Sequence, residues 1–443
     1  MNVIVLVSDT FRYDYLGCNG NDWIGTQALD QFAQRAVSFD RHYLSSFPTI
    51  PNRTDLFTGR YSFPFHGWKP LEPGLPVMST VFKDAGYTTQ LICDTPHLMK
   101  GTHHFDRGFD GAHWIRGQEG DKPLLKGNLP PSVVIPNDKT RVDPHMRDTR
   151  FGNLATLHRW TNRDWAWEED RFCVKTAQAT NRWLEENHDA DPFLLWVDFF
   201  DAHEPWDPPE YLARRYDSHK PYDGPPMIHP NYGKSSDLTE AELKNLRAHY
   251  CAEAELVDRY VGRILEKIDD LSLWENTIVI FTTDHGISLG EKERTGKSNI
   301  HDNDDRYWPL YPEIAHIPFM IAAPGLEGGT EVDVIAQPVD TMSTLAELAG
   351  IEVDQPEDIE GKSFAPQLKG DRDKTCREFA VTSQWLGQSL GDNGMTPVVY
   401  TDKWAYIPIG PYKGRELYDL ESDPETLNNV INGNEEKASE LHK

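Results

Sequence analysis

Cysteine is scarce in this chain of 443 residues and follows no recognisable pattern. The five cysteines form no CxxC pair and no even set of the kind that a disulfide framework requires, which excludes a disulfide-stapled scaffold. We therefore expect reduced thiols, most of them buried. The cysteines are Cys18, Cys93, Cys173, Cys251 and Cys376.

Long apolar runs and a surplus of positive charge are also missing. The apolar start "MNVIVLVSDT" is too short to span a bilayer and follows no basic segment, so we expect a cytoplasmic protein. The chain carries 71 acidic against 44 basic residues, a formal charge of −27, which disfavours binding to nucleic acid or to an anionic membrane. An anionic substrate would need a local positive site, built by a metal or by a few buried cations.

Continuous apolar segments of strand length recur along the chain and indicate a buried parallel sheet. Helical patterns lie between them, at residues 26–39 for example, so we expect an α/β fold with a doubly wound central sheet. The expected strands are Asn2–Ser8, Thr88–Asp94, Phe193–Phe199, Asn276–Gly286 and the segment "HIPFMIAAPG".

The composition changes twice along the chain. Residues 121–150 are rich in Pro, Lys and Asp and lack periodicity, which predicts an insertion or a long surface loop. A late helix, "VDTMSTLAELAGI", is followed by short strand-like segments and a terminal helix. We therefore predict a catalytic domain over residues 1–365 and a small C-terminal domain over residues 366–443.

Polar residues follow three of the expected strands: Asp9-Thr10, His203-Glu204 and Asp284-His285. Burying acidic and imidazole groups at the ends of strands is unfavourable unless a partner neutralises or binds them. One divalent metal could pair with several of these groups at once. Each of these residues alone could be a helix N-cap or a satisfied buried histidine. Their recurrence at strand ends favours a metal site.

The stretch "SSFPTIPNRTDLFTGRY", residues 45–61, predicts a helix that begins near Thr49, with Pro51 in its first turn. Arg53 lies one turn further along the same face. A hydroxyl at this position would lie near the positive end of the helix and near the guanidinium of Arg53. Both positive charges would stabilise its alkoxide form. The alternative is a plain threonine N-cap beside a surface arginine.

The chain resembles the sulfatase family of the alkaline phosphatase superfamily over nearly its full length. This resemblance implies an alkaline-phosphatase-like fold, with a mixed, mostly parallel sheet flanked by helices and a small C-terminal α+β domain that carries an antiparallel sheet. The matching segments are "VIVLVSDTFRYDYLGCNG", "PTIPNRTDLFTGRY", "AGYTTQLI", "VDFFDAHEPWDPP", "VIFTTDHGISLGEK", "IPFMIAAPG" and "LYDLESDPETLNN".

The resemblance also implies roles for individual residues. The implied ligands of one divalent metal are Asp9, Thr49, Asp284 and His285. Arg53 would stabilise the nucleophile, Lys297 and His203 would bind the ester oxygens or protonate the leaving group, and His301 is a weaker candidate nearby. A solvated loop lysine remains the alternative for Lys297.

The chain departs from the family at several of these positions. Family sulfatases have Cys or Ser, modified to formylglycine, where this chain has Thr49, and a second acidic ligand where it has Thr10. Where the family has "GKWH" this chain has "CDTPH", so His97 is the candidate to replace the family histidine. Asp94 in the same segment could be a metal ligand, a substrate contact or a structural turn residue. Arg116 is a further candidate for contacting substrate, or a salt-bridged surface residue.

These departures predict the chemistry. A threonine cannot become formylglycine, and the covalent adduct of its alkoxide must be cleaved by water at the central atom, which suits phosphorus. We therefore expect hydrolysis of a monoanionic small-molecule or sugar ester, a phosphodiester or a phosphonate monoester, with Zn²⁺ or Mn²⁺ favoured over Ca²⁺ by the imidazole ligand. The alternatives are a sulfatase that works without formylglycine and a non-catalytic binding relative.

Overall fold

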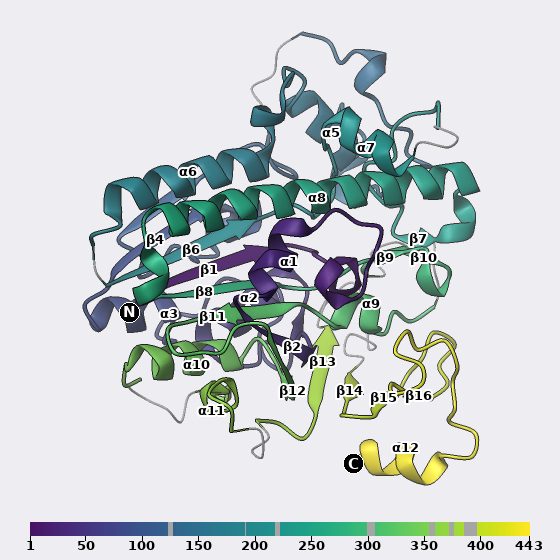
Figure 1. Ribbon diagram of the computed structural model, residues 1–443. Coiled ribbons are helices and arrows are strands. Elements are labelled where there is room, and N and C mark those ends of the chain that lie inside the picture. The colour runs from purple at the N-terminus through teal and green to yellow at the C-terminus, as the bar shows by residue number, and fades with distance from the viewer. Residues whose placement is uncertain are drawn as a thin grey trace.

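The computed structural model describes residues 1–122, 127–190, 192–217, 222–298, 306–353, 359–371, 376–384 and 397–443. Its centre is an eight-stranded sheet in the order β12-β2-β11-β8-β1-β6-β4-β5 (Figure 1). The strands are β1 (Asn2–Ser8), β2 (Val37–His42), β4 (Thr88–Cys93), β5 (Gly111–Trp114), β6 (Phe193–Phe199), β8 (Thr277–Thr283), β11 (Phe319–Ala322) and β12 (Thr330–Ala336).

The sheet is mixed and mostly parallel, as the sequence predicts. Strand β1 pairs in parallel with both β6 and β8, and only β11 runs antiparallel to its neighbours β8 and β2. Every residue of β1 is buried, with Ile4 and Leu6 in one core and Val3, Val5 and Val7 in the other. A strand buried on both faces explains the continuous apolar run that identified it.

Helices cover both faces of the sheet. The long helices α6 and α8 run side by side across one face, together with α1, while α2, α3, α10 and α11 pack on the other (Figure 1). The helices are α1 (Gln27–Ala33), α2 (Thr49–Thr58), α3 (Met78–Asp84), α4 (Pro96–Met99), α5 (Leu154–Thr161), α6 (Phe172–Asn187), α7 (Glu210–Tyr216), α8 (Glu240–Asp270), α9 (Pro312–Ala315), α10 (Asp340–Ala349), α11 (Ala365–Leu368) and α12 (Glu435–Leu441).

A second sheet contains five strands in the order β16-β15-β14-β13-β3. Four come from the C-terminal part, β13 (Ala380–Gln384), β14 (Val398–Tyr400), β15 (Trp404–Ile407) and β16 (Glu416–Asp419), and form the expected antiparallel ladder. The fifth, β3 (Ser46–Phe47), lies directly before α2 and pairs in parallel with β13. The C-terminal segment therefore contributes to holding the start of α2.

A third, small sheet joins β7 (Gly233–Lys234), β10 (Arg294–Gly296) and β9 (Ser288–Leu289), so that Lys297 follows β10 directly. The described part of residues 121–150 holds two short 3₁₀ turns, Pro131–Val133 and Pro144–Met146, and no strand, as expected of an insertion. The helix expected over residues 26–39 is shorter, because the chain turns at Gln34 and continues as β2.

Among the described residues, none of the helices combines the length and the apolarity that crossing a membrane requires. The cysteines are free thiols, four of them buried and Cys18 exposed, in agreement with the sequence prediction.

Candidate active site

Two acidic residues meet at the carboxyl edge of the central sheet. Ser8, the last residue of β1, pairs with Thr283, the last residue of β8, so Asp9 and Asp284 leave neighbouring strands together. Both are fully buried. Oxygen atoms of these two carboxylates and one ring nitrogen of His285 lie within 4.8 Å of one another. The predicted ligands Asp9, Asp284 and His285 are therefore gathered in one place.

The bonding state of these three side chains fits a divalent metal. The ring Nδ1 of His285 donates to the carbonyl of Gly286 (3.0 Å), which leaves a buried Nε2 without a hydrogen-bond partner, and Asp9 Oδ2 also lacks a hydrogen bond. Burial lowers the pKa of His285 to about 4, so its ring is neutral and can ligate. The unpartnered nitrogen of His285 and Asp9 Oδ2, whose charged neighbour is Arg53 Nη1 (3.1 Å), are the atoms that a metal would use.

The two carboxylates differ in their ionisation. Burial and the nearby Asp284 raise the pKa of Asp9 well above its usual value. Burial opposes ionisation of Asp284 too, but His285 and Arg53 hold its pKa below the usual range. The ionised form of Asp9 is therefore unfavourable in the site by itself, and a bound cation would stabilise it.

Helix α2 brings Thr49 and Arg53 to these carboxylates. The helix begins at Thr49 and includes Pro51 in its first turn, as predicted. Arg53, fully buried, places Nη1 2.5 Å from Asp284 Oδ2 and 3.1 Å from Asp9 Oδ2. The same Nη1 lies 3.5 Å from the carbonyl oxygen of Thr49. Arg53 is therefore not a surface arginine, and it links Thr49 to the acidic pair.

Asp198 is a residue of the site that the sequence analysis did not single out. It lies in β6, and its carboxylate accepts hydrogen bonds from Arg53 Nε (3.0 Å) and Nη2 (2.8 Å). It also accepts hydrogen bonds from the indole of Trp196 (3.1 Å) and the hydroxyl of Thr95 (2.5 Å). The one signal available in the sequence was an acidic residue inside the apolar run "FLLWVDF".

Lys297 lies inside the site rather than on a solvated loop. It is 5% exposed, and its Nζ donates to Thr10 Oγ1 (3.0 Å) and to Glu204 Oε2 (3.3 Å). Thr10 in turn donates to Asp9 Oδ1 (2.7 Å), and its backbone N–H donates to Asp284 Oδ1 (3.0 Å). Thr10 thus supplies hydrogen bonds where family members supply a carboxylate.

His203 is also buried, and its Nδ1 lies 3.6 Å from Glu204 Oε2, the oxygen that Lys297 Nζ approaches to 3.3 Å. Its Nδ1 donates to the carbonyl of Glu204 (2.5 Å), and its ring stacks on Phe200 with the centroids 4.0 Å apart. Burial and the charge of Lys297 lower the pKa of His203 well below its ordinary value. The ring is therefore neutral near pH 7, with Nε2 free to accept a proton.

Of the remaining candidates, His97 lies near the site, because its ring packs edge-on against Phe200, the residue that stacks on His203, with the centroids 5.6 Å apart. His97 hydrogen-bonds to the buried Glu119 (3.1 Å) and contacts Trp68, whereas the exposed Arg116 pairs with Asp121 (2.6 Å). Asp94 is fully buried, and its Oδ1 accepts a hydrogen bond from the backbone N–H of Phe200 (2.8 Å). His301 lies outside the described residues. The substrate-binding roles of these residues stay predictions.

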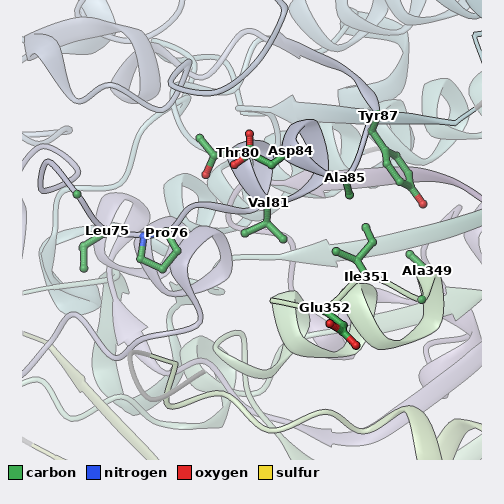
Figure 2. Close-up of a pocket in the computed structure, with 12 residues that line it drawn as sticks. Leu75, Pro76, Thr80, Val81, Asp84, Ala85, Tyr87, Ala349, Ile351 and Glu352 are labelled. Atoms are coloured by element: carbon green, nitrogen blue, oxygen red, sulfur yellow. The ribbon is translucent and has the colours of Figure 1, made fainter. Parts of the chain in front are cut away.

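A separate cavity of about 600 Å³ lies away from this site. Figure 2 shows its walls, which come from α3, the loop before it, Tyr87 and residues 349–352 after α10. Tyr87 directly precedes β4, so the cavity opens at the amino ends of the parallel strands, whereas Asp9 and Asp284 lie at their carboxyl ends. Active sites of α/β proteins form at the carboxyl edge of the sheet, so the size of this cavity does not identify the active site.

Comparison with known proteins agrees with this architecture. The Sulfatase family model matches residues 1–351, and a model of the N-sulphoglucosamine sulphohydrolase C-terminal region matches residues 301–443. The family match and the fold together define a hydrolase that acts on ester bonds and has an α/β architecture with an alkaline-phosphatase-like sheet. The chain belongs to the sulfatase family, whose members generally bind a divalent metal.

Similar proteins include both arylsulfatases and a phosphonate monoester hydrolase. An arylsulfatase of Clostridium perfringens is 26% identical over 98% of this chain and 91% of its own. Human arylsulfatase K is 24% identical over 97% of this chain and 78% of its own. The crystal structure of a phosphonate monoester hydrolase of Agrobacterium radiobacter superimposes with a TM-score of 0.73 at 20% identity, covering 100% of this chain and 95% of that one.

Proposed function

We propose that the chain hydrolyses a monoanionic phosphorus ester, a phosphodiester or a phosphonate monoester, with Thr49 as its nucleophile. The observation that carries this proposal is the threonine itself, at the start of α2 and one turn before Arg53. In family sulfatases the formylglycine hydrate expels sulfate by collapsing to an aldehyde. A threonine has no second hydroxyl on Cβ, so that route is closed to Thr49.

Hydrolysis of the ester then proceeds by two successive displacements at phosphorus. Thr49 first loses its hydroxyl proton to solvent, and the alkoxide Oγ1 then attacks phosphorus. The bond to the leaving alcohol breaks, and the departing oxygen takes a proton from Lys297, which solvent reprotonates. Water next attacks the phosphothreonine, the P–Oγ1 bond breaks, and Thr49 regains a proton. His203 suits the second step, because its neutral ring leaves Nε2 available to accept a proton from that water.

The cationic side chains account for the charge of the ester. Arg53 faces the start of α2 and both acidic residues, so its charge can stabilise the alkoxide of Thr49, and Lys297, directly after β10, adds a second positive charge beside Thr10. A divalent metal held by Asp9, Asp284 and His285, with Thr49 as the fourth ligand, would lower the pKa of the Thr49 hydroxyl and polarise the ester. We propose Zn²⁺ or Mn²⁺, because an imidazole is among the ligands.

The test is a substrate panel with variants of Thr49. An aryl phosphodiester, an aryl phosphonate monoester and an aryl sulfate are offered to the wild type with added Zn²⁺, Mn²⁺ or Ca²⁺. We expect turnover of a phosphorus ester, loss of at least 10³-fold in Thr49→Ala, and partial activity in Thr49→Ser, which keeps the hydroxyl. Metal binding should only weaken in Thr49→Ala.

A control on the same helix isolates the hydroxyl. Thr58 is buried at the far end of α2, and its hydroxyl donates to the carbonyl of Thr54 (2.7 Å). Thr58→Ala should keep the activity of the wild type. Full activity in Thr49→Ala would show that Thr49 is not the nucleophile.

Hydrolysis of a sulfate ester is the second candidate, because the arylsulfatases named above cover nearly the whole chain. The same panel separates the two: preference for the aryl sulfate in the wild type would favour it and contradict the phosphorus assignment. We expect instead that Thr49→Cys, produced with a formylglycine-generating enzyme, gains sulfate turnover that the wild type lacks.

A further inference from the structure

A second group of buried side chains, three of them acidic, lies near the candidate active site. We call it the rear cluster: Asp94, Gln118, Cys173, Asp201 and Glu253. These residues come from the end of β4, the segment after β5, the first turn of α6, the segment after β6 and the middle of α8. Each is at most 3% exposed. Five separate elements thus converge on one interior position.

The rear cluster is compact. Cys173 Sγ and one carboxylate oxygen each of Asp201 and Glu253 lie within 4.8 Å of one another. Gln118 Nε2 donates to Asp201 Oδ1 (2.6 Å), and the backbone N–H of Cys173 donates to Asp201 Oδ2 (3.0 Å). Asp201 therefore stands at the centre, with its own two oxygens already bonded.

The oxygens around Asp201 are only half satisfied. Glu253 Oε2 accepts from the backbone N–H of Asp207 (3.0 Å), and Asp94 Oδ1 accepts from that of Phe200 (2.8 Å). Their other oxygens, Glu253 Oε1 and Asp94 Oδ2, are buried without a hydrogen-bond partner, and so is Gln118 Oε1. Because the Gln118 amide nitrogen donates to Asp201, the orientation of this amide is set. Three unpartnered acceptors in one interior place call for a positive partner.

The protein supplies little positive charge here. Within the described part of the chain, no ion pair joins Asp94, Asp201 or Glu253 to Lys, Arg or His, although Arg171 lies near enough to favour ionisation of Glu253. The neighbouring Asp207 is engaged by His158. Burial raises the pKa of Asp201 to about 6 and raises the pKa values of Asp94 and Glu253 well above the ordinary values of these groups. Three carboxyl groups thus share a site in which Arg171 is a nearby cation but forms no direct ion pair with them among the described residues.

We propose that the rear cluster binds a second divalent cation, distinct from the one implied at Asp9, Asp284 and His285. Its ligands are oxygens of Asp201, Glu253, Asp94 and Gln118. An oxygen-dominated set of this kind selects a hard cation, Ca²⁺ or Mg²⁺. Cys173 borders the site, and its thiol, whose pKa burial raises, is a poor ligand.

The cation of the rear cluster has a positioning role. Asp94 and Asp201 hold the segment 198–203, which carries Asp198 at one end and His203 at the other. Phe200, bonded to Asp94 through its N–H, stacks on His203. Ser8, the residue before Asp9, donates its hydroxyl to the carbonyl of Asp201 (2.8 Å). Binding at the rear cluster therefore fixes the segment that presents the catalytic histidine.

The test counts ions per chain. The full-length protein is stripped with a chelator and dialysed against Ca²⁺ or Mg²⁺ together with Zn²⁺, and bound metal is measured by mass spectrometry. We expect two ions per chain in the wild type and one in Glu253→Gln. Asp284→Asn should also keep one ion, and that ion should be Ca²⁺ or Mg²⁺.

A matched control lies on the same helix. Glu255 is also buried on α8 but pairs with Arg215 and Tyr216, so Glu255→Gln should still bind two ions. Saturation of the wild type at one ion, or loss of all metal in Asp284→Asn, would overturn the proposal even if Glu253→Gln does not fold. Retention of Zn²⁺ alone in Asp284→Asn would overturn the assignment to a hard cation.

Discussion

Arg53 shares one buried positive charge among three carboxylates. Asp284 and Asp9 face its Nη1, and Asp198 faces its Nε and Nη2. A guanidinium holds its donors in a rigid plane, so binding Asp198 on one edge leaves Nη1 directed at the acidic pair. Asp198 is therefore a positioning residue, which acts on the site through Arg53.

Asp198→Asn tests this role. The substitution keeps the shape and removes the charge, so Arg53 loses its two-bond partner while Asp284 still binds it. We expect kcat to fall by about 10–10²-fold with a smaller change in KM, together with a loss of stability of about 3–5 kcal/mol for a broken buried ion pair. Steady-state kinetics and urea unfolding measure the two effects.

An exposed ion pair supplies the control for Asp198→Asn. Arg41 Nε lies 2.9 Å from Asp333 Oδ1, and the Asp333 side chain is 63% exposed. Asp333→Asn should change stability by less than about 1 kcal/mol and leave kcat unchanged. If Asp198→Asn behaved like Asp333→Asn, the positioning role of Asp198 would be refuted.

At the scale of elements, α8 connects the sheet to several other parts of the molecule. Its 31 residues pack against α1, α6 and α7, and Glu253 contributes to the rear cluster from its middle. Asp258 on the same helix accepts hydrogen bonds from the backbone N–H groups of Ala28 (3.1 Å) and Leu29 (2.7 Å) in the first turn of α1. This contact docks α1 through an acidic residue that is 3% exposed.

The contact predicts a pH dependence of stability. Burial raises the pKa of Asp258 to about 7, so the folded state prefers the protonated carboxyl. A raised folded pKa gives stability that is present below the unfolded pKa near 4 and lost as the pH rises through about 7. Relative to Asp258→Asn, the wild type should therefore lose free energy of unfolding between pH 4 and pH 8.

Urea unfolding of both proteins at four pH values in this range measures the difference. The slope should not exceed about 1.4 kcal/mol per pH unit, which is the linkage limit for one proton. If the free energy of unfolding of the wild type instead rose relative to that of Asp258→Asn as the pH increased, the amino end of α1 would hold the Asp258 carboxyl ionised, contrary to the prediction.

At the scale of the whole molecule, the active site joins distant parts of the chain. Asp9 follows β1, Asp284 and His285 follow β8, and Thr49 begins a helix whose preceding strand belongs to the C-terminal sheet. A metal at these ligands would bind the folded state and not the unfolded chain, so it should stabilise the whole protein by mass action.

Metal removal tests this coupling. Chelation should abolish turnover and lower the melting midpoint, and a metal supplied at 100 times its Kd should restore about 2.7 kcal/mol. Thermal unfolding with Zn²⁺, Mn²⁺ or Ca²⁺ added back one at a time identifies the ion that restores both properties. Asp284→Asn should lose the response to Zn²⁺ and Mn²⁺, and an unchanged response would place that metal elsewhere.

Local features of the chain were sufficient to predict the buried strands and most of the candidate metal ligands. An uninterrupted apolar run predicts a strand buried on both faces, and Asn2–Ser8 and Phe193–Phe199 have the predicted bounds. Acidic and imidazole residues directly after such strands, together with the helix that begins at Thr49, identified the metal-site candidates before their positions were known.

Only the tertiary structure decided which side chains meet. Asp198 has the local appearance of one acidic residue in an apolar strand, and its role follows from Arg53, 145 positions earlier in the chain. Glu253 looks like an ordinary helical glutamate until α8 crosses the sheet beside Asp201. The physical reason is that burial, charge pairing and unpartnered oxygens are properties of a packed neighbourhood, to which residues far apart in sequence contribute.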